Sequence, residues 1–323
     1  MANSEWAVEL RPKTLDQMVG QEVNREIIKN WIAERNLPNA IIFYGKSGSG
    51  KTTSARIIPR LMDAELIELD AASHNSVDDA RQLNEQAARM SLTGRYKIFL
   101  IDEAHMLSNG AWNALLKTIE EPNDKICFIF CTTEYTKLPM TIRGRARMLK
   151  FYSVPDEQLK EYAEAVLEHK GYTLKEEVID LIVRRARGQV RDLLKLLQTA
   201  CEGNLNDLDK LKKFLAIPDT KGMRTFINAV LDCVPKVGIP VINSINTDLI
   251  EWVQALQAHI YELLEDKYGV REITADIITK NKIKALENKF SDKQFGALLT
   301  ELNKIQRNDT AYAQLYALLF RGI

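Results

Sequence analysis

The chain has 323 residues, of which 46% are hydrophobic and 27% are charged. These proportions are ordinary for a globular protein and exclude fibrous, collagenous and largely disordered chains. Lysines and arginines number 44, as do aspartates and glutamates, so the zero net charge excludes a wholly basic nucleic-acid coat protein but not a local basic patch. A chain of this length predicts about two domains.

The N-terminal segment contains Glu5 and Glu9 and no apolar stretch, so it lacks the features of a signal peptide. No apolar run approaches the roughly 18 residues of a membrane span. We expect a cytoplasmic protein without a membrane partner. Reduced, buried thiols fit that location, because no Cys-x-x-Cys pair occurs among the four cysteines, Cys127, Cys131, Cys201 and Cys233.

Residues 1–155 alternate short apolar runs with segments long enough for helices. The runs are apolar at consecutive positions and rich in β-branched or aromatic residues, which is typical of strands buried in a parallel sheet. They cover residues 40–44 (AIIFY), 66–69 (LIEL), 97–101 (KIFLI) and 126–131 (ICFIFC). This alternation predicts an α/β domain with helices on both faces of the sheet.

After Pro155 the strand pattern fades and helical spacing replaces it. Val190, Leu193, Leu194 and Leu197 lie on one face of a predicted helix. A similar stripe precedes Gly188, so we expect a small helical domain over residues 156–216. Further stripes predict a helical bundle over residues 217–323, and they comprise Val253, Leu256, Ile260 and Leu263, then Leu298, Leu302 and Ile305.

The segment 45–52, GKSGSGKT, matches G-x-x-x-x-G-K-[ST] at every fixed position. It follows a predicted strand and precedes a predicted helix, as a phosphate-binding loop requires. Its glycines let backbone N–H groups face phosphate oxygens, Lys51 can reach the β- and γ-phosphates, and Thr52 can ligate Mg²⁺. We expect the nucleotide to contact Gly45, Lys46, Ser47, Gly48, Ser49, Gly50, Lys51, Thr52 and Thr53.

The run 97–103, KIFLIDE, supplies the second half of such a site. Asp102 would hold Mg²⁺ through water, and Glu103 would orient or deprotonate the attacking water. An Asp-Glu pair after a strand is usually the start of a solvated loop, but the phosphate loop about 50 residues earlier favours the catalytic interpretation. His105 completes DEAH, and we expect it to pack or hydrogen-bond without a chemical role.

Seven collinear segments now resemble the AAA+ clamp-loader ATPases, such as the gamma/tau subunits of bacterial DNA polymerase III, replication factor C small subunits and phage loader subunits. They are LRPKTLDQMVGQE (10–22), GKSGSGKT (45–52), LIELDAAS (66–73), KIFLIDEAHMLS (97–108), NALLKTIEEP (113–122), TTEYTKLPMTIRGRAR (132–147) and GQVRDLLKLL (188–197). The resemblance implies an α/β P-loop AAA+ domain (residues 1–155), a helical lid (156–216) and an all-α collar (217–323).

The resemblance also assigns roles to residues outside the phosphate loop. Thr133 would sense the γ-phosphate, although its alternative role is to cap the next helix. Arg191, on the second lid helix, would couple the lid to the nucleotide in cis, although an arginine beside an apolar stripe is usually only solvated. The adenine would pack against an N-terminal segment that otherwise suits a surface turn: Arg11, Pro12, Val19 and Gly20.

Arg145 would act in trans as an arginine finger on a neighbouring subunit. The chain has Gly144-Arg145-Ala146 where the family has Ser-Arg-Cys, and Arg143 and Arg147 flank it, so a solvated basic stretch is the alternative. The family's four-cysteine zinc module is also missing between Thr53 and Leu66. We therefore expect ATP and Mg²⁺ as cofactors, no zinc, and a short form of a phage or archaeal-like kind.

The resemblance implies three kinds of partner: primer-template DNA, a sliding clamp, and other loader subunits in a ring, most simply a hetero-pentamer. DNA phosphates would contact Asn75, Ser76, Ser108, Asn109 and Gly110, which otherwise suit two ordinary helix caps. The clamp would contact Met90 and Leu92, for which an interior position is the rival interpretation.

The predicted function is that of an ATP-driven clamp-loader ATPase subunit in DNA replication. Another AAA+ motor, such as a branch-migration helicase, would need a C-terminal winged-helix domain, for which residues 220–323 show no strand signal. A catalytically silent scaffold subunit is the third possibility. The intact set of Lys51, Thr52, Asp102 and Glu103 argues against it.

Overall fold

The computed structural model describes residues 5–89, 96–121, 125–215, 220–245, 249, 252–257, 260, 291–305, 313–315 and 317–318. The chain divides into two compact units, Met1–Leu208 and Asp209–Ile323. Within these described ranges, no helix combines the length and the hydropathy needed to cross a membrane.

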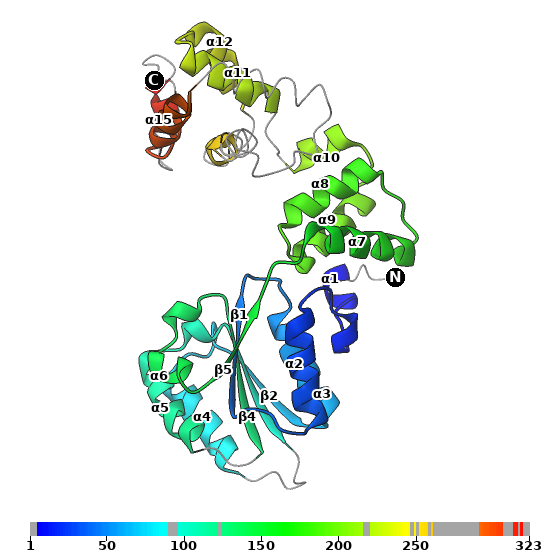
Figure 1. The fold of residues 1–323 in the computed structure, drawn as a ribbon, viewed down its shortest axis with the longest axis vertical. Coiled ribbons are helices and arrows are strands. Elements are labelled where there is room, and N and C mark those ends of the chain that lie inside the picture. Colours follow the sequence, from blue (N-terminus) through cyan, green and yellow to red (C-terminus); the bar gives the residue numbers. More distant parts are fainter. Residues whose placement is uncertain are drawn as a thin grey trace. The chain divides into compact units, whose positions relative to one another are not determined.

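A five-stranded parallel sheet with the order β2-β3-β4-β1-β5 forms the centre of the first unit (Figure 1). The strands are β1 (Ala40–Gly45), β2 (Glu65–Asp70), β3 (Lys97–Asp102), β4 (Ile126–Thr132) and β5 (Arg147–Phe151). The sequence predicts the first four. It does not predict β5, because this edge strand buries only Leu149 and Phe151 and therefore has no continuous apolar run.

Helices cover both faces of the sheet, as the α/β pattern predicts (Figure 1). Helices α2 (Glu22–Ala33) and α3 (Lys51–Met62) lie on one face. On the other lie α4 (Val77–Ala88), α5 (Asn109–Glu120) and α6 (Met140–Arg143). Short 3₁₀ turns at Leu15–Gln17, Ala104–Met106 and Tyr135–Lys137 complete the connections.

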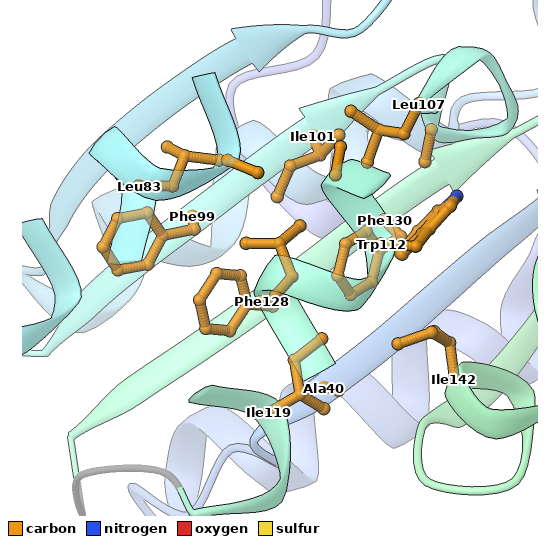
Figure 2. Close-up of a cluster of buried hydrophobic side chains, with 14 of the residues drawn as sticks. Ala40, Leu83, Phe99, Ile101, Leu107, Trp112, Ile119, Phe128, Phe130 and Ile142 are labelled. Carbon is orange, nitrogen blue, oxygen red and sulfur yellow. The ribbon is translucent and has the colours of Figure 1, made fainter. Parts of the chain in front are cut away.

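Each central strand contributes side chains to two separate cores, which explains why its sequence is apolar at every position. In β4, Phe128 and Phe130 face α4 and α5, whereas Cys127, Ile129 and Cys131 face α2 and α3. Figure 2 shows the first of these cores, in which Phe99 stacks on Phe128 with ring centroids 4.9 Å apart. Trp112 of α5 packs against Phe130 at 5.1 Å.

The helical lid completes the first unit. It comprises α7 (Asp156–Lys170), α8 (Glu176–Ala186) and α9 (Val190–Glu202), with the predicted stripe residues Leu193, Leu194 and Leu197 buried. The N-terminal helix α1 (Trp6–Glu9) packs on α9, where the Trp6 backbone N–H donates to Gln198 Oε1 at 2.8 Å. The N-terminal segment therefore belongs partly to the lid, which the sequence does not predict.

The second unit is helical wherever it is described. Its helices include α10 (Leu208–Phe214), which begins at the boundary, α11 (Thr220–Leu231), α12 (Pro235–Asn243) and α15 (Asp292–Leu302). The predicted stripe residues Val253, Leu256, Ile260, Leu298 and Leu302 are buried in its core, whereas Leu263 lies outside the described residues. The proposed boundary at residue 216 and the role of this unit as a collar stay predictions.

We predict that Phe128→Ala lowers the free energy of unfolding by about 3–5 kcal/mol, because it leaves a cavity between two stacked rings. Phe128 is fully buried, whereas Val23 on α2 is 69% exposed, so Val23→Ala is the matched control. Chemical denaturation of the two variants and the parent chain measures the difference. Equal midpoints for Phe128→Ala and Val23→Ala would contradict the packing described above.

Candidate active site

The phosphate loop joins the end of β1 to the start of α3 and depends on glycines. Gly45 has φ +150°, and a Cβ there would lie 2.2 Å from the Phe151 carbonyl oxygen of neighbouring β5. Gly48 has φ +70° and approaches the lid, because an added Cβ would lie 3.3 Å from Arg191 Cβ. Only glycine allows the loop to curl this closely between the sheet and the lid.

Lys51 is buried at the start of α3, with only 6% of its surface exposed. Its Nζ donates to the carbonyl oxygens of Gly45 at 3.0 Å and Lys46 at 2.8 Å. Burial lowers the pKa of Lys51, and the attraction of Asp102 and Glu103 offsets this only in part. A buried cation bonded to neutral carbonyls is a ready partner for an anion at the loop.

Thr52 and Asp102 form the contact that links the two halves of the site. Thr52 Oγ1 donates to Asp102 Oδ2 at 2.9 Å and lies 3.1 Å from Oδ1. A hydroxyl, a single carboxylate and phosphate oxygens are the ligands with which Mg²⁺ is usually held, alongside retained waters. This donor set fits Mg²⁺. In the described residues no group of three or more His, Cys, Asp or Glu side chains forms an all-protein metal site.

A cavity beside the phosphate loop gathers most of the predicted nucleotide-binding residues. Its walls include Arg11, Pro12, Val19, residues 47–53, Asp102, Glu103 and Arg191. Gly45 and Lys46 lie beneath it, where they accept from Lys51, and Gly20 packs instead near Val154, which lies 3.2 Å from an added Cβ.

The cavity also has apolar walls that the sequence analysis does not assign to it: Ala7, Leu10, Met18, Tyr162, Val190 and Leu194, together with the polar Gln17. Val190 and Leu194 belong to the helical stripe that looks like simple lid core. Tyr162 carries no motif at all. These residues can be recognised as cavity walls only in the folded structure, where α1, α7 and α9 surround the loop. A cavity with apolar walls and a few placed polar groups suits a ligand with a flat base and a charged tail.

Basic side chains line the cavity alongside the acidic Asp102 and Glu103. Arg11, Lys51 and Arg191 all line it. Burial lowers the pKa of Arg11, and the charges of Arg56 and Arg191 lower it further. Repulsion among these cations is relieved when a polyphosphate binds between them, which favours a nucleotide over a neutral ligand.

The lid touches the phosphate loop directly. With its side-chain amide turned so that nitrogen faces the loop, Gln189 donates to the Ser47 carbonyl at 2.9 Å and to Asp192 Oδ2 at 3.1 Å. Gln189 Cβ would also lie 3.5 Å from a Cβ on Gly48. Gln189 and Arg191 thus link the orientation of α9 to the phosphate loop. Only Arg191 is predicted from the sequence.

Thr133 and Thr132 occupy different places at the tip of β4. Thr132 is fully buried, and its Oγ1 accepts from the Glu134 backbone N–H at 3.0 Å and lies 3.1 Å from His105 Nδ1. Thr133 is partly exposed. Neither lines the cavity, so γ-phosphate sensing by Thr133 stays a prediction.

Arg145 does not line the cavity of its own chain. It follows α6, is 44% exposed at its side chain, pairs with Glu120 Oε1 at 2.8 Å and donates to the Thr141 carbonyl at 2.9 Å. An exposed guanidinium away from its own site suits a contact with another subunit.

The residues predicted to contact DNA lie at two neighbouring helix N-termini. Ser76 caps α4 and Ser108 caps α5, and the Ser108 backbone N–H donates to the Asn75 carbonyl at 3.1 Å. The α4 terminus carries Asp78 and Asp79 in its first turn, whereas the first turn of α5 has no acidic residue. An anion is therefore favoured at α5, with Asn109 and Gly110, over α4. Met90 and Leu92 lie outside the described residues.

Comparison with known proteins finds similarity to subunits of DNA polymerase III. A family model described as DNA polymerase III, delta subunit, matches residues 59–155. The DNA polymerase III subunit gamma of Buchnera aphidicola is 28% identical over 340 residues, which cover 97% of this chain and 90% of that protein. The gamma/tau subunit of Mycoplasma genitalium is 32% identical over 250 residues, which cover 68% of this chain and 42% of that protein. The chain thus spans less than half the length of the Mycoplasma relative.

Solved structures show the same fold. The Thermotoga maritima RuvB Holliday junction branch migration motor superposes with a TM-score of 0.55 and 20% identity, covering 68% of this chain and 79% of that one. Its likeness and the parallel sheet confirm the predicted AAA+ α/β fold with a mostly helical remainder. The named relatives confirm the resemblance to clamp-loader subunits.

We predict that Lys51→Met abolishes ATP binding, because it removes the buried cation of the phosphate loop. The thermal midpoint should stay equal or rise, since the variant no longer buries a charge. Titration with a fluorescent ATP analogue and a thermal melt measure the two effects. Lys46→Met is the control, because the Lys46 side chain is exposed on the same loop and does not line the cavity. Tight binding by Lys51→Met would refute the phosphate assignment.

Proposed function

We propose that this relative of the AAA+ clamp-loader subunits is an ATPase that places a sliding clamp on primer-template DNA during replication. The observation that carries the proposal is one cavity that joins the phosphate loop, the Thr52–Asp102 pair, Glu103 and a basic lid residue, Arg191. The names of the gamma and gamma/tau relatives supply the replication setting. The cytoplasmic location stays part of this proposal.

In the proposed reaction, Lys51 exchanges its carbonyl partners for the β- and γ-phosphate oxygens. Thr52 and Asp102 would hold Mg²⁺, which would supply positive charge to neutralise the phosphate oxygens. Glu103, at the carboxyl end of β3, orients a water in line with the γ-phosphorus and accepts its proton as the bond to the leaving oxygen breaks. Arg191 on α9 draws the lid toward the bound phosphates.

The proposed assembly is a ring in which each ATP lies between two subunits. Arg145 leaves Glu120 and reaches the γ-phosphate of the neighbouring site, where it stabilises charge in the transition state. Hydrolysis then waits until ring closure and DNA binding align the two subunits. Several copies of this chain with one or more other subunits, most simply a hetero-pentamer, meet this requirement.

DNA is proposed to run past the N-terminus of α5, where Asn109 and Gly110 present N–H groups and Ser108 a hydroxyl, without a carboxylate in the first turn. Such contacts bind a phosphate backbone without reading bases. Asn75 and Ser76 support the Ser108 loop and lie beside acidic Asp78 and Asp79, so we assign them a lesser share. Met90 and Leu92 remain the proposed clamp contacts.

A branch-migration motor is the second candidate, because the fold resembles RuvB. Both candidates hydrolyse ATP in a ring on DNA, but only a loader should respond to a clamp. A catalytically silent scaffold subunit would neither hydrolyse ATP nor respond to a clamp.

We predict that the ATPase rate rises strongly only when primer-template DNA, the cognate clamp and the co-purifying subunits are all present. Steady-state phosphate release with each component omitted in turn measures this. Stimulation by DNA alone, with no response to the clamp, would favour the motor. An ATPase that stays absent under every condition would favour the scaffold.

We predict that Arg145→Ala and Lys51→Met are each inactive and complement each other within one ring. In mixed complexes, a site that binds ATP in an Arg145→Ala subunit meets an intact Arg145 from a Lys51→Met neighbour. Arg145→Ala alone should lower the hydrolysis rate by about 10³-fold or more while ATP binding persists. Arg147→Ala, an exposed neighbour on β5, is the control. A mixture no faster than the sum of its parts would exclude action in trans.

A further inference from the structure

Two segments, the one that follows β3 and the one at the end of β4, bring their polar side chains together around His105. The imidazole is only 10% exposed at its side chain. Its Nδ1 lies 3.1 Å from Thr132 Oγ1 and 3.5 Å from Glu103 Oε2, and its Nε2 lies 3.3 Å from Glu134 Oε1. The ring thus connects the residue after β3 to the tip of β4, with Nδ1 near both sides and Nε2 near Glu134 alone.

On the β3 side, one carboxylate oxygen of Glu103 lacks a hydrogen-bond partner. Its Oε2 is buried and has no hydrogen-bond partner, whereas the residue as a whole lines the nucleotide cavity. Its backbone has φ +47°, a left-handed conformation that is uncommon for glutamate and fixes where the carboxylate lies. A buried acceptor without a donor is costly, and the nearest ring nitrogen is Nδ1 of His105.

On the β4 side, the ring is held in place. Glu134 donates its backbone N–H to Thr132 Oγ1 at 3.0 Å, and its carboxylate pairs with Lys137 Nζ at 2.9 Å. Glu134 therefore has a fixed place from which to accept from Nε2. Nε2 thus faces the Glu134 carboxylate, and Nδ1 faces both Thr132 Oγ1 and Glu103 Oε2.

We propose that His105 is a positioning residue for Glu103. Its Nδ1, which lies 3.1 Å from Thr132 Oγ1 and 3.5 Å from the inner oxygen of Glu103, holds that oxygen in place, which leaves the outer oxygen to accept from the attacking water, while Nε2 anchors the ring to Glu134. A small movement of the β4 tip would therefore move the base. This inference rests on the proposed role of Glu103 in hydrolysis, and it gives His105 a task that the sequence analysis does not assign.

Two substitutions separate the two ring nitrogens. The amide nitrogen of asparagine matches the position of Nδ1, and that of glutamine matches Nε2. We expect His105→Gln to lower kcat for ATP hydrolysis by about 10- to 100-fold, as expected when a catalytic group is misplaced by about 1 Å. His105→Asn should stay within about threefold of the parent. Both should bind ATP as the parent does, because His105 does not line the cavity.

His169→Gln is the matched control, because His169 is exposed near the end of α7. A parental kcat for His105→Gln, or equal losses for His105→Asn and His105→Gln, would overturn the proposal. A fall in ATP affinity together with the thermal midpoint would show a purely structural role and would also overturn it. If the parent chain hydrolyses ATP but does not respond to a clamp, the loader function is refuted. The comparison of the His105 variants then still tests the positioning role.

A second measurement needs no hydrolysis. Long-range ¹H–¹⁵N spectra at one fixed pH report both ring nitrogens of each of the four histidines, and His105→Gln identifies the signals of His105. We expect Glu103→Gln to shift the Nδ1 resonance more than Nε2, and Glu134→Gln to do the reverse. Unchanged His105 resonances in Glu103→Gln would overturn the contact even if every variant were inactive.

Discussion

The hydrogen bond from Thr52 to Asp102 joins two segments that are 50 residues apart, and the candidate site depends on it. The strand order makes this bond possible. Because β4 pairs with both β1 and β3, the carboxyl ends of β1 and β3 flank a crevice at the edge of the sheet. Ligands of open α/β sheets bind in such crevices. The continuous hydrophobic cores on both faces hold the strands that fix this geometry.

The remaining walls of the cavity come from segments that the sheet does not contain. The N-terminal segment contributes Arg11, Met18 and Val19, and the lid contributes Tyr162 and Arg191. Trp6 binds the N-terminal helix to α9, and Gln189 binds α9 to the phosphate loop. A ligand in the cavity therefore contacts three parts of the chain at once, which is how a small molecule can influence the position of a whole helical layer.

The sequence predicts those features that depend on short-range pattern. Strands β1, β3 and β4 carry buried apolar residues on both faces, whereas the predicted strand β2 lies at the sheet edge without a buried residue. The segments GKSGSGKT and KIFLIDE have fixed spacings that tie residue type to chemistry. Strand β5 is not predicted from the sequence, because half of it faces solvent. Tyr162 and Leu194 are not predicted as cavity residues, because a cavity wall and a helix core use the same residue types. The contacts of His105 escape because they join the end of β3 to the end of β4, and no pattern along the chain encodes that distance.

The close approach of the lid to the phosphate loop has a kinetic consequence. Arg191 and Gln189 lie over Gly48 and Ser47, on the side of the loop that faces the cavity. In the proposed ATPase, a nucleotide at the loop would lie next to Arg191. Separation of α9 from the loop, a microsecond-to-millisecond motion, would then affect the residence time of the proposed hydrolysis product, together with the strength of the phosphate contacts. In the proposed cycle, movement of the lid would thus control how long the product stays in the site.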